Sequence, residues 1–332
     1  MKATYYSRRY DALRQQVDRY LAAAVERGGP RQLTDACKYV LAGGGKRLRA
    51  VLTLLSCEAV GGRLRDALHA SAAVEIMHNF TLVHDDVMDH APSRRGRPTV
   101  HIRWDLNSAL LVGDVLLGLS YRHLLRTKSA SLPPLVSSFT TCVIEVCEGQ
   151  ALDLEFEDRT DVTVQAYFRM IGKKTGRLIS LATELGARIG GGTPRQIAAL
   201  ARFGLYLGRA FQLRDDLLDV VADRKEFGKA IGGDIMEGKK TFLLLTAADR
   251  ARGNDRALIQ RVLRRQARTL GPSRKVVPTV TDIYRRYGVI ADAQQLIGRN
   301  TGYATKALSS LPTTRTTAML SWLADELAQR AA

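Results

Sequence analysis

The sequence predicts an all-α protein that folds as a single domain over residues 1–332. Ala, Leu, Arg and Glu, which favour helices, dominate the chain, and it contains only 9 prolines. Apolar residues recur at helical spacing, whereas the alternation typical of half-buried strands is scarce. The breaks between apolar runs are short, and none has the composition of an interdomain linker. We therefore expect a bundle in which the central helices are buried all round.

Glycine and proline mark the ends of the expected helices. The first helix, over residues 5–27, is amphipathic and stops at the Gly-Gly-Pro of 28–30. The run over 64–89 is too apolar for a surface helix, so we expect it at the centre of the bundle. Pro194 begins a later helix, at a position where proline is favoured. In chain order, the helices after the first cover 33–41, 48–60, 64–89, 107–125, 135–156, 163–189, 194–221 and a tail from 241 that is broken at 271–273.

Composition excludes several classes of protein. Apolar residues make up 45% of the chain and charged residues 25%, which argues against a mainly disordered chain. No apolar stretch reaches the ~18 residues that a membrane-spanning helix needs. The N-terminal segment MKATYYSRRY has no apolar region typical of a secretion signal. The cysteines form no CxxC pair and are expected to be reduced core residues of a cytoplasmic protein: Cys37, Cys57, Cys142 and Cys147.

The chain is strongly basic. It has 50 Lys and Arg against 33 Asp and Glu, which gives a net charge of +17. Such a surface attracts polyanions, although it can also serve solubility alone. No recognisable nucleic-acid-binding motif accompanies the charge, so a nucleic-acid partner is not expected. The charge is more consistent with a small phosphorylated ligand, because the acidic residues are clustered.

The strongest motif is the acidic turn HDDVMD over residues 84–89. Asp85 and Asp89 are four residues apart and lie one turn apart on one helix face, with Asp86 beside them. Like charges this close destabilise a helix. Mg²⁺ would relieve the repulsion, because it takes oxygen ligands and shares them with phosphates. The alternative is an exposed acidic turn, which fits poorly with the very apolar stretch over 70–83.

The same spacing recurs about 130 residues later, in QLRDDLLD over 212–219. Asp215, Asp216 and Asp219 again end an apolar helix, where cations offset the negative end of the helix dipole. A single motif of this kind arises easily by chance. Two of them in equivalent places predict opposing metal-binding walls of one cavity, which would hold a diphosphate between metal ions.

Three basic segments accompany the acidic clusters. The glycine turn GGGKRLR over 43–49 places Lys46 and Arg49 at the start of a helix, where backbone N–H groups bind anions. Arginines at 94–97 follow the first cluster, and lysines at 229 and 239–240 follow the second. Arginine suits bidentate phosphate contacts. The spacing is not that of a P-loop. Each segment alone is compatible with solvated surface, but together they favour a bound diphosphate.

These motifs resemble, in order and spacing, those of the trans-isoprenyl diphosphate synthases (polyprenyl synthetases). The resemblance runs from about Gly43 to Leu245, and the tail over 246–332 is merely compatible with it. Gly176 departs from the family pattern, in which alanine is usual. The segments that carry the resemblance are GGGKRLR (43–49), EIMHNFTLVHDDVMD (75–89), RRGRPT (94–99), VGD (112–114), EGQALDL (148–154), KKTGRL (173–178), FQLRDDLLD (211–219) and GKAIGGDIMEGKKT (228–241).

The resemblance implies a fold, an assembly and a set of roles. The family folds as helices around a deep central cavity and forms homodimers with each active site inside one subunit. It condenses isopentenyl diphosphate with an allylic diphosphate and uses Mg²⁺, with three ions per active site when substrate is bound. The metal ligands would be Asp85, Asp89, Asp215, Asp216 and Asp219, with Asp86 nearby. Contacts to isopentenyl diphosphate would come from Lys46, Arg49, His78 and Arg95. Contacts to the allylic diphosphate would come from Arg94, Lys174, Lys229 and Lys239. Thr175 and Gln212 would line the carbocation.

Product length is expected to depend on Phe80, five residues before Asp85, and on Thr81. In the family, an aromatic residue at the first position shortens the product. Phe80 with the small Thr81 resembles a geranylgeranyl-type (C20) synthase. A farnesyl (C15) or longer product remains the alternative, and Phe80 could be a core residue without that role.

Two further functions fit parts of the pattern. A class I terpene cyclase also ionises diphosphates on an aspartate-rich helix, but it needs no isopentenyl site and its second metal motif is usually of another type. A non-catalytic subunit that regulates an active synthase would keep the fold, but such subunits tend to lose aspartates. Here neither aspartate cluster is incomplete.

Overall fold

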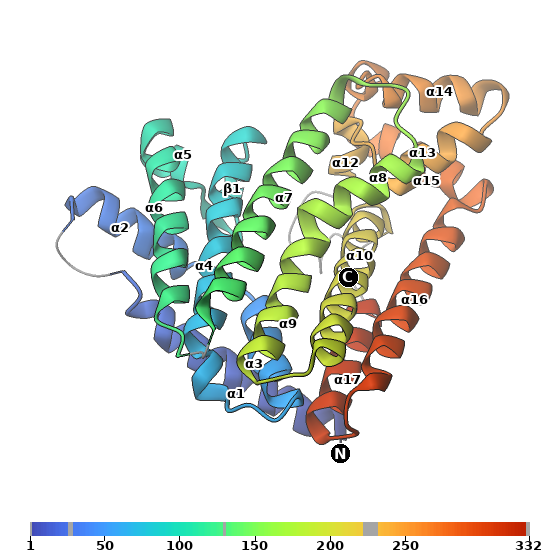
Figure 1. Cartoon of the computed structure of the whole chain (residues 1–332). Helices are drawn as coiled ribbons and strands as arrows, with labels where there is room; N and C mark the ends of the chain where they lie inside the picture. Colours follow the sequence, from blue (N-terminus) through green and yellow to red (C-terminus); the bar gives the residue numbers. More distant parts are fainter. Residues whose placement is uncertain (1, 26–28, 129–130, 222–231, 330–332) are drawn as a thin grey trace. The chain divides into compact units, whose positions relative to one another are not determined.

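The computed structural model describes residues 2–25, 29–128, 131–221 and 232–329, and it is almost entirely helical (Figure 1). The all-α class is therefore confirmed. The chain forms two compact units. Unit 1 comprises residues 1–141, 178–201 and 308–322, and unit 2 comprises 142–177, 202–307 and 323–332. The expectation of a single domain around a central cavity stays a prediction.

Unit 1 is built on helices that precede and follow the first acidic turn. Its only regular strands in the described residues pair as an antiparallel hairpin with Ser93 opposite Pro98. In chain order its elements are α1 (Lys2–Ala22), α2 (Arg31–Leu41), α3 (Leu48–Ala59), α4 (Leu64–Met88), β1 (Ser93–Arg94), β2 (Arg97–Pro98), α5 (Val100–Arg103), α6 (Leu106–Leu125) and η3 (Leu308–Ser310), with parts of α7 (Leu132–Asp158), α9 (Arg177–Ile189), α10 (Pro194–Val221) and α17 (Arg315–Gln329).

Helix α4 is the central helix of unit 1. It packs against α3 and α6, and every residue from Ala70 to Met77 is buried. The expectation of a buried central helix over 64–89 is therefore confirmed. The close approach of α6 depends on Gly113, because a Cβ there would lie 2.0 Å from Nε2 of His84. The apolar residues of α4 thus fix the position of the acidic turn at its end.

Unit 2 contains the second acidic cluster at the end of α10. A short turn of π-helix, η1, joins α8 to α9 where the sequence predicted one continuous helix. The elements of unit 2 not yet named are α8 (Val164–Ile171), η1 (Gly172–Gly176), α12 (Gly233–Glu237), α13 (Phe242–Arg250), α14 (Gly253–Leu263), η2 (Ala267–Leu270), α15 (Ser273–Arg286) and α16 (Val289–Ala307).

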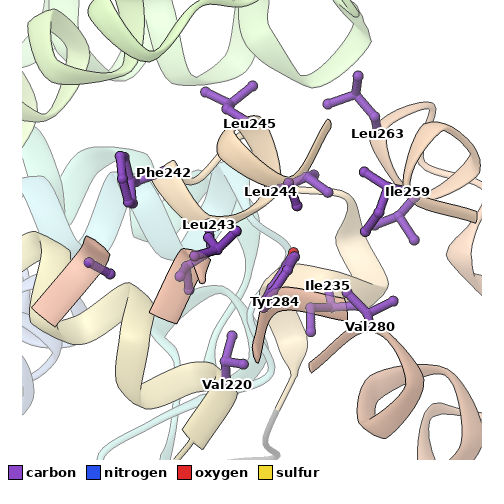
Figure 2. Packing of buried hydrophobic residues seen from close by; sticks show 14 of the residues in the cluster. Val220, Ile235, Phe242, Leu243, Leu244, Leu245, Ile259, Leu263, Val280 and Tyr284 are labelled. Atoms are coloured by element: carbon purple, nitrogen blue, oxygen red, sulfur yellow. The ribbon is translucent and has the colours of Figure 1, made fainter. Parts of the chain in front are cut away.

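An apolar core holds the short helix α12 in unit 2. Figure 2 shows Val220 of α10, Ile235 of α12 and Tyr284 of α15 in the same cluster as the leucines of α13. Ile235 is 2% exposed and Tyr284 is 1% exposed. Because Ile235 directly follows Asp234, and Val220 directly follows Asp219, this core positions two carboxylates that matter below.

Most expected helices match the observed bounds closely, and the differences have local causes. The first helix ends at Ala22 instead of at 27. The hairpin over 93–98 was not expected; it turns through Arg95 and Gly96, both with positive φ. All four cysteines are free, but Cys147 is exposed. The expectation that all four are core residues is wrong for Cys147.

Helix α6 departs from the expectation that no segment could span a membrane. Among the described residues it alone is long and apolar enough by composition, and 44% of its most apolar window is buried inside the structure. It also contains Asp114 and Arg122 and packs against α2, α4 and α5. Buried core helices meet the same criterion, so this is weak evidence for a membrane span.

Candidate active site

The first acidic cluster lies at the C-terminal end of α4. Asp85 and Asp86 are in its last turn, and Asp89 follows Met88 as the capping residue, with its N–H donating to the Asp85 carbonyl at 2.8 Å. The negative end of the helix dipole points at these carboxylates. Asp89 is exposed, whereas Asp86 is buried. A cation at this end would offset both the dipole and the mutual repulsion of the carboxylates.

Arg94 of the hairpin contacts this cluster. Its Nε donates to Oδ1 of Asp86 at 2.7 Å, and its Nη2 lies 3.8 Å from Oδ2 of Asp85. Burial raises the pKa of Asp86, and the Arg94 guanidinium partly offsets this. The structure therefore brings a predicted phosphate-binding arginine next to the predicted metal ligands.

Arg49 on α3 and His78 on α4 are hydrogen-bonded to each other between these two helices. Nη1 of Arg49 lies 3.0 Å from Nε2 of His78. Because arginine can only donate, Nε2 accepts, and the ring proton lies on Nδ1. Burial, followed by the charge of Arg49, holds the pKa of His78 well below its usual range. His78 is therefore a neutral imidazole with an N–H that can donate to a phosphate oxygen.

The glycine turn over 43–46 lies beside the hairpin. Nη1 of Arg95 donates to the carbonyl of Gly44, and the hydroxyl of Tyr10 donates to the carbonyl of Lys46 at 2.5 Å. The Lys46 side chain is exposed. Arg95 thus reaches the turn that carries Lys46, and the predicted sharing of one diphosphate by these two residues stays a prediction. Arg95 also lines a small cavity between α2, α4 and the hairpin.

Phe80 and Thr81 lie on α4, on the N-terminal side of the acidic turn. Phe80 is 7% exposed and packs edge-to-face on His84, with ring centroids 5.1 Å apart. Thr81 donates from its hydroxyl to the carbonyl of His78 at 2.8 Å. The burial of Phe80 suits a core residue as well as a residue that limits the product.

In unit 2 a chain of hydrogen bonds joins the residues predicted around the carbocation. Thr175 of η1 donates to Oε1 of Gln212 at 2.8 Å, and Nε2 of Gln212 donates to Oδ1 of Asp216 at 2.8 Å. The hydroxyl of Tyr167 donates to the other oxygen of Asp216 at 2.7 Å. The structure thus brings Thr175 and Gln212 together, and their role beside the carbocation stays a prediction. Tyr167 had no signal in the sequence beyond being an apolar position on a helix.

Asp219 lies beside a carboxylate that the sequence interpretation had not assigned. The backbone N–H of Asp234, in α12, donates to Oδ2 of Asp219 at 3.0 Å. Burial first, and then the charge of Asp234, raise the pKa of both Asp216 and Asp219 well above the usual range. Lys239 offsets part of this effect at both carboxylates. Asp234 sits in the quoted segment GGDIMEGKKT, so the motif itself was the available signal.

Lys174 lies on the π-helical turn η1, a conformation that often marks functional positions. Its ammonium contacts Oδ2 of Asp153 at 2.7 Å. Gly149 allows this approach, since a Cβ there would lie 2.4 Å from the backbone nitrogen of Lys174. Asp153 belongs to the segment EGQALDL, and its spacing within that segment does not reveal its contact with Lys174.

The departure at Gly176 has a packing partner. A Cβ on Gly208 of α10 would lie 2.6 Å from Cα of Gly176, so the two backbones are in close contact there. The departure therefore removes no ligand from the site.

The two neighbouring lysines of the GKKT segment behave differently. Lys240 is buried and donates to three carbonyls, those of Glu157, Gly238 and Leu263. Lys239 is half-buried, and its charge lowers the pKa of the buried Asp216, whereas its predicted contact with the allylic diphosphate stays a prediction. Lys229, another predicted phosphate contact, lies outside the described residues.

The donor set fits divalent cations that are shared with a ligand. In the described part of the chain, no three His, Cys, Asp or Glu side chains are gathered into a complete metal site. Mg²⁺ is usually held by one or two carboxylates and completed by substrate phosphates and water. Carboxylates that repel one another, as Asp219 and Asp234 do, are the groups that such a cation stabilises.

The helical fold, with its acidic clusters and neighbouring basic side chains, is the arrangement expected of an enzyme that acts on diphosphates. Comparison with known proteins agrees. The sequence profile of the polyprenyl synthetase family matches residues 30–280. A short chain isoprenyl diphosphate synthase of Methanothermobacter thermautotrophicus is 40% identical over 303 residues, which is 91% of each chain. A geranylgeranyl diphosphate synthase of Sulfolobus acidocaldarius is 36% identical over 79% of each chain.

Solved structures agree as well. The crystal structure of the geranylgeranyl pyrophosphate synthetase of Pyrococcus horikoshii superposes with a TM-score of 0.92 at 33% identity, over 99% of this chain and 100% of that one. The chain therefore belongs to the polyprenyl synthetase family, the trans-isoprenyl diphosphate synthases, and it is a prenyltransferase. The resemblance found from the motifs alone is confirmed.

Proposed function

We propose that the protein adds isopentenyl diphosphate to an allylic diphosphate, head to tail, and releases geranylgeranyl diphosphate. The observation that carries this proposal is the pairing of neutral His78 with Arg49 beside the Lys46 turn. This group lies in the same unit as the first acidic cluster but does not include it. It offers a second set of phosphate donors, which a one-substrate diphosphate enzyme would not need.

Divalent cations are proposed at both acidic clusters. Asp85 and Asp89 would hold Mg²⁺ in unit 1, and Asp215, Asp216 and Asp219 in unit 2, with three ions when substrate is bound. Bound Mg²⁺ neutralises charge that develops on a leaving diphosphate. Asp234 supports this, because its charge adds to the negative potential at Asp219.

The protein's own residues would bind and orient the substrates. Arg94, Lys174 and Lys239, together with Lys229, would hold the allylic diphosphate, and Arg49, His78, Lys46 and Arg95 would hold isopentenyl diphosphate. The allylic C–O bond breaks with its electron pair on the departing diphosphate. The double bond of isopentenyl diphosphate then attacks the cation, and a proton is lost to the diphosphate. Thr175 and Gln212, which are hydrogen-bonded to each other, would supply oxygen dipoles that stabilise positive charge.

Two rival functions are separated by one experiment. Purified protein is incubated with Mg²⁺, labelled isopentenyl diphosphate and an allylic diphosphate, with EDTA as the matched control. We expect metal-dependent incorporation of the label. A terpene cyclase would release diphosphate from the allylic substrate without incorporating label, and a regulatory subunit would do neither. Either result would overturn the proposed function.

The C20 product is supported by Phe80 and by the relatives. Several of the relatives are named geranylgeranyl diphosphate synthases, at 36–42% identity. Others carry longer-chain names, such as an all-trans-nonaprenyl-diphosphate synthase of Rhodobacter capsulatus at 38% identity over 83% of this chain. A bulky, buried Phe80, five residues before Asp85 on the same helix, favours the shorter product.

Replacing this side chain tests that assignment. Phe80→Ala is expected to shift the products beyond C20, because the tail can grow into the space of the lost ring. Phe80→Leu keeps most of the bulk and should still stop at C20. Chain-length analysis of the extracted products distinguishes the two variants. Because Phe→Ala in a core costs about 3–5 kcal/mol, retained folding is checked by circular dichroism. A folded Phe80→Ala enzyme with unchanged products would refute the role of Phe80.

We also propose that two copies associate through the outer face of α6. Leu106, Leu110, Leu111 and Leu125 are 43–55% exposed on this helix, which is unusual for leucine in such number. Burying them in a homodimer would remove this apolar area from water. Light scattering should then give twice the chain mass of 36.6 kDa. For localisation we propose the cytoplasm, which suits the four free cysteines.

A further inference from the structure

Arg47 is a buried charge in the GGGKRLR turn with no role in the proposed chemistry. It directly precedes α3 and is 3% exposed. Its backbone adopts the left-handed conformation, with φ of 51°. That conformation is costly for a residue other than glycine and persists where the surroundings hold it in place. The side-chain contacts of Arg47 hold its backbone in this conformation.

The guanidinium of Arg47 joins three helices. Its Nε donates to Oδ1 of Asp18 on α1 at 2.9 Å, and its Nη1 donates to Oε1 of Glu75 on α4 at 3.3 Å. Its Nη2 donates to the carbonyl of Leu41, the last residue of α2, at 2.6 Å. The planar fork of arginine can satisfy acceptors in three directions, which the single ammonium of lysine cannot do in the same way.

This contact lies next to the Arg49–His78 pair. Arg47 is two residues before Arg49, and Glu75 is three residues before His78 on α4. The two pairs therefore form successive links between the start of α3 and the middle of α4. The backbone of the turn is held from its other side as well, because Tyr10 donates to the carbonyl of Lys46.

We propose that Arg47 and Glu75 are positioning residues for the diphosphate of isopentenyl diphosphate. They hold the turn with Lys46 and the start of α3 at a set distance from His78, so that the phosphate donors converge. This inference rests on the proposed function of Lys46, Arg49 and His78. It assigns no contact between Arg47 and the substrate.

A positioning role can be separated from a stabilising role, because both partners of a buried ion pair can be replaced together with little loss of stability. Oε2 of Glu75 is buried and has no hydrogen-bond partner in the described structure, so removing Arg47 alone would leave an uncompensated charge. Replacing both partners of a buried ion pair with apolar residues of similar size often preserves stability. The double variant Arg47→Met, Glu75→Leu therefore removes the link and both charges together. Asp18 is 37% exposed, so it keeps access to water.

The experiment measures KM for each substrate, kcat and the melting temperature. For the double variant we expect KM for isopentenyl diphosphate to rise about 10-fold, since small displacements of binding groups weaken binding strongly. KM for the allylic diphosphate and the melting temperature should be unchanged. Arg47→Lys, which keeps the charge but not the fork, should raise the same KM. The matched control, Arg63→Met, Asp66→Leu, removes an ion pair at the N-terminus of α4 and should change neither KM.

Several outcomes would overturn the proposal. One is a folded double variant with wild-type KM for isopentenyl diphosphate. Another is an equal loss for both substrates, which indicates general disorder of the site. If the double variant does not fold, Arg47→Lys decides through the same comparison of the two KM values. A wild-type enzyme that incorporates no isopentenyl diphosphate overturns the proposed function as well, so the two failures are distinguishable.

Discussion

Asp85→Asn is expected to lower kcat/KM by about 10³-fold while leaving the fold intact. Asparagine keeps the size of the side chain but supplies only one neutral oxygen to a cation. Removing one group that stabilises developing charge typically costs about 10²–10³-fold in rate, and a lost metal ion removes several such contacts. The side chain of Asp85 is 20% exposed at the end of α4, and Arg94 keeps its hydrogen bond to Asp86 in the variant.

The same helix supplies a control. Asp66→Asn makes the identical chemical change in the first turn of α4, where Asp66 is paired with exposed Arg63. This variant should keep wild-type kcat/KM. Steady-state kinetics with both diphosphates at varied Mg²⁺ check the pair. An Asp85→Asn enzyme within about 10-fold of wild type at saturating Mg²⁺ would exclude a direct metal role for this residue.

Asp219→Asn is expected to raise the melting temperature of the metal-free protein and to lower its activity. Burial and the charge of Asp234 raise the pKa of Asp219, so its charged form is disfavoured in the folded chain. Asparagine removes that charge, and its oxygen can still accept the N–H of Asp234. Without divalent cations, the melting temperature should therefore rise by about 2–4 °C. Activity should fall by about 10²-fold, because a proposed metal ligand is lost.

Mg²⁺ provides a second measurement on the same variant. A ligand that binds only the folded state stabilises it by about 2.7 kcal/mol at 100 times its Kd. Mg²⁺ with inorganic diphosphate should raise the melting temperature of wild type, and Asp219→Asn should lose most of that increase. Asp282→Asn, at an exposed aspartate of α15 paired with Arg285, is the control and should respond like wild type. If Asp219→Asn lowered the melting temperature without metal, the repulsion argument would be wrong.

The acidic clusters could be predicted because their geometry is local. Asp85 and Asp89 share a helix face by their spacing alone, and the same holds for Asp215 and Asp219. The apolar run before Asp85 predicted a buried central helix, and α4 is buried as expected. Long helices with clear glycine stops were located for the same reason.

The partners of these residues could not be predicted because they come from distant segments. Tyr167 donates to Asp216 from 49 residues away, and Asp153 contacts Lys174 across two helices. Such pairs depend on how helices pack, which spacing within one helix does not reveal. Asp234 and Asp153 did lie in the recognised segments, so their type was visible but their partners were not.

Adjacent identical residues show the same limit. Lys239 and Lys240 are equivalent in the sequence, yet only the structure reveals that Lys240 is buried on three carbonyls. Likewise, the structure sets Arg47 apart from Lys46 and Arg49 by its left-handed backbone and its burial. By residue type these side chains are all simply basic, whereas their contacts in the structure show that they have different surroundings.

The most direct test of the account is the chain length of the wild-type product. Purified protein is supplied with Mg²⁺, isopentenyl diphosphate and, in separate reactions, the C5, C10 and C15 allylic diphosphates. The extracted products are dephosphorylated and identified by mass spectrometry. A C20 end-product is expected from every acceptor that is used. A C15 end-product, or a series extending beyond C20, would contradict the assignment of Phe80 and of the product.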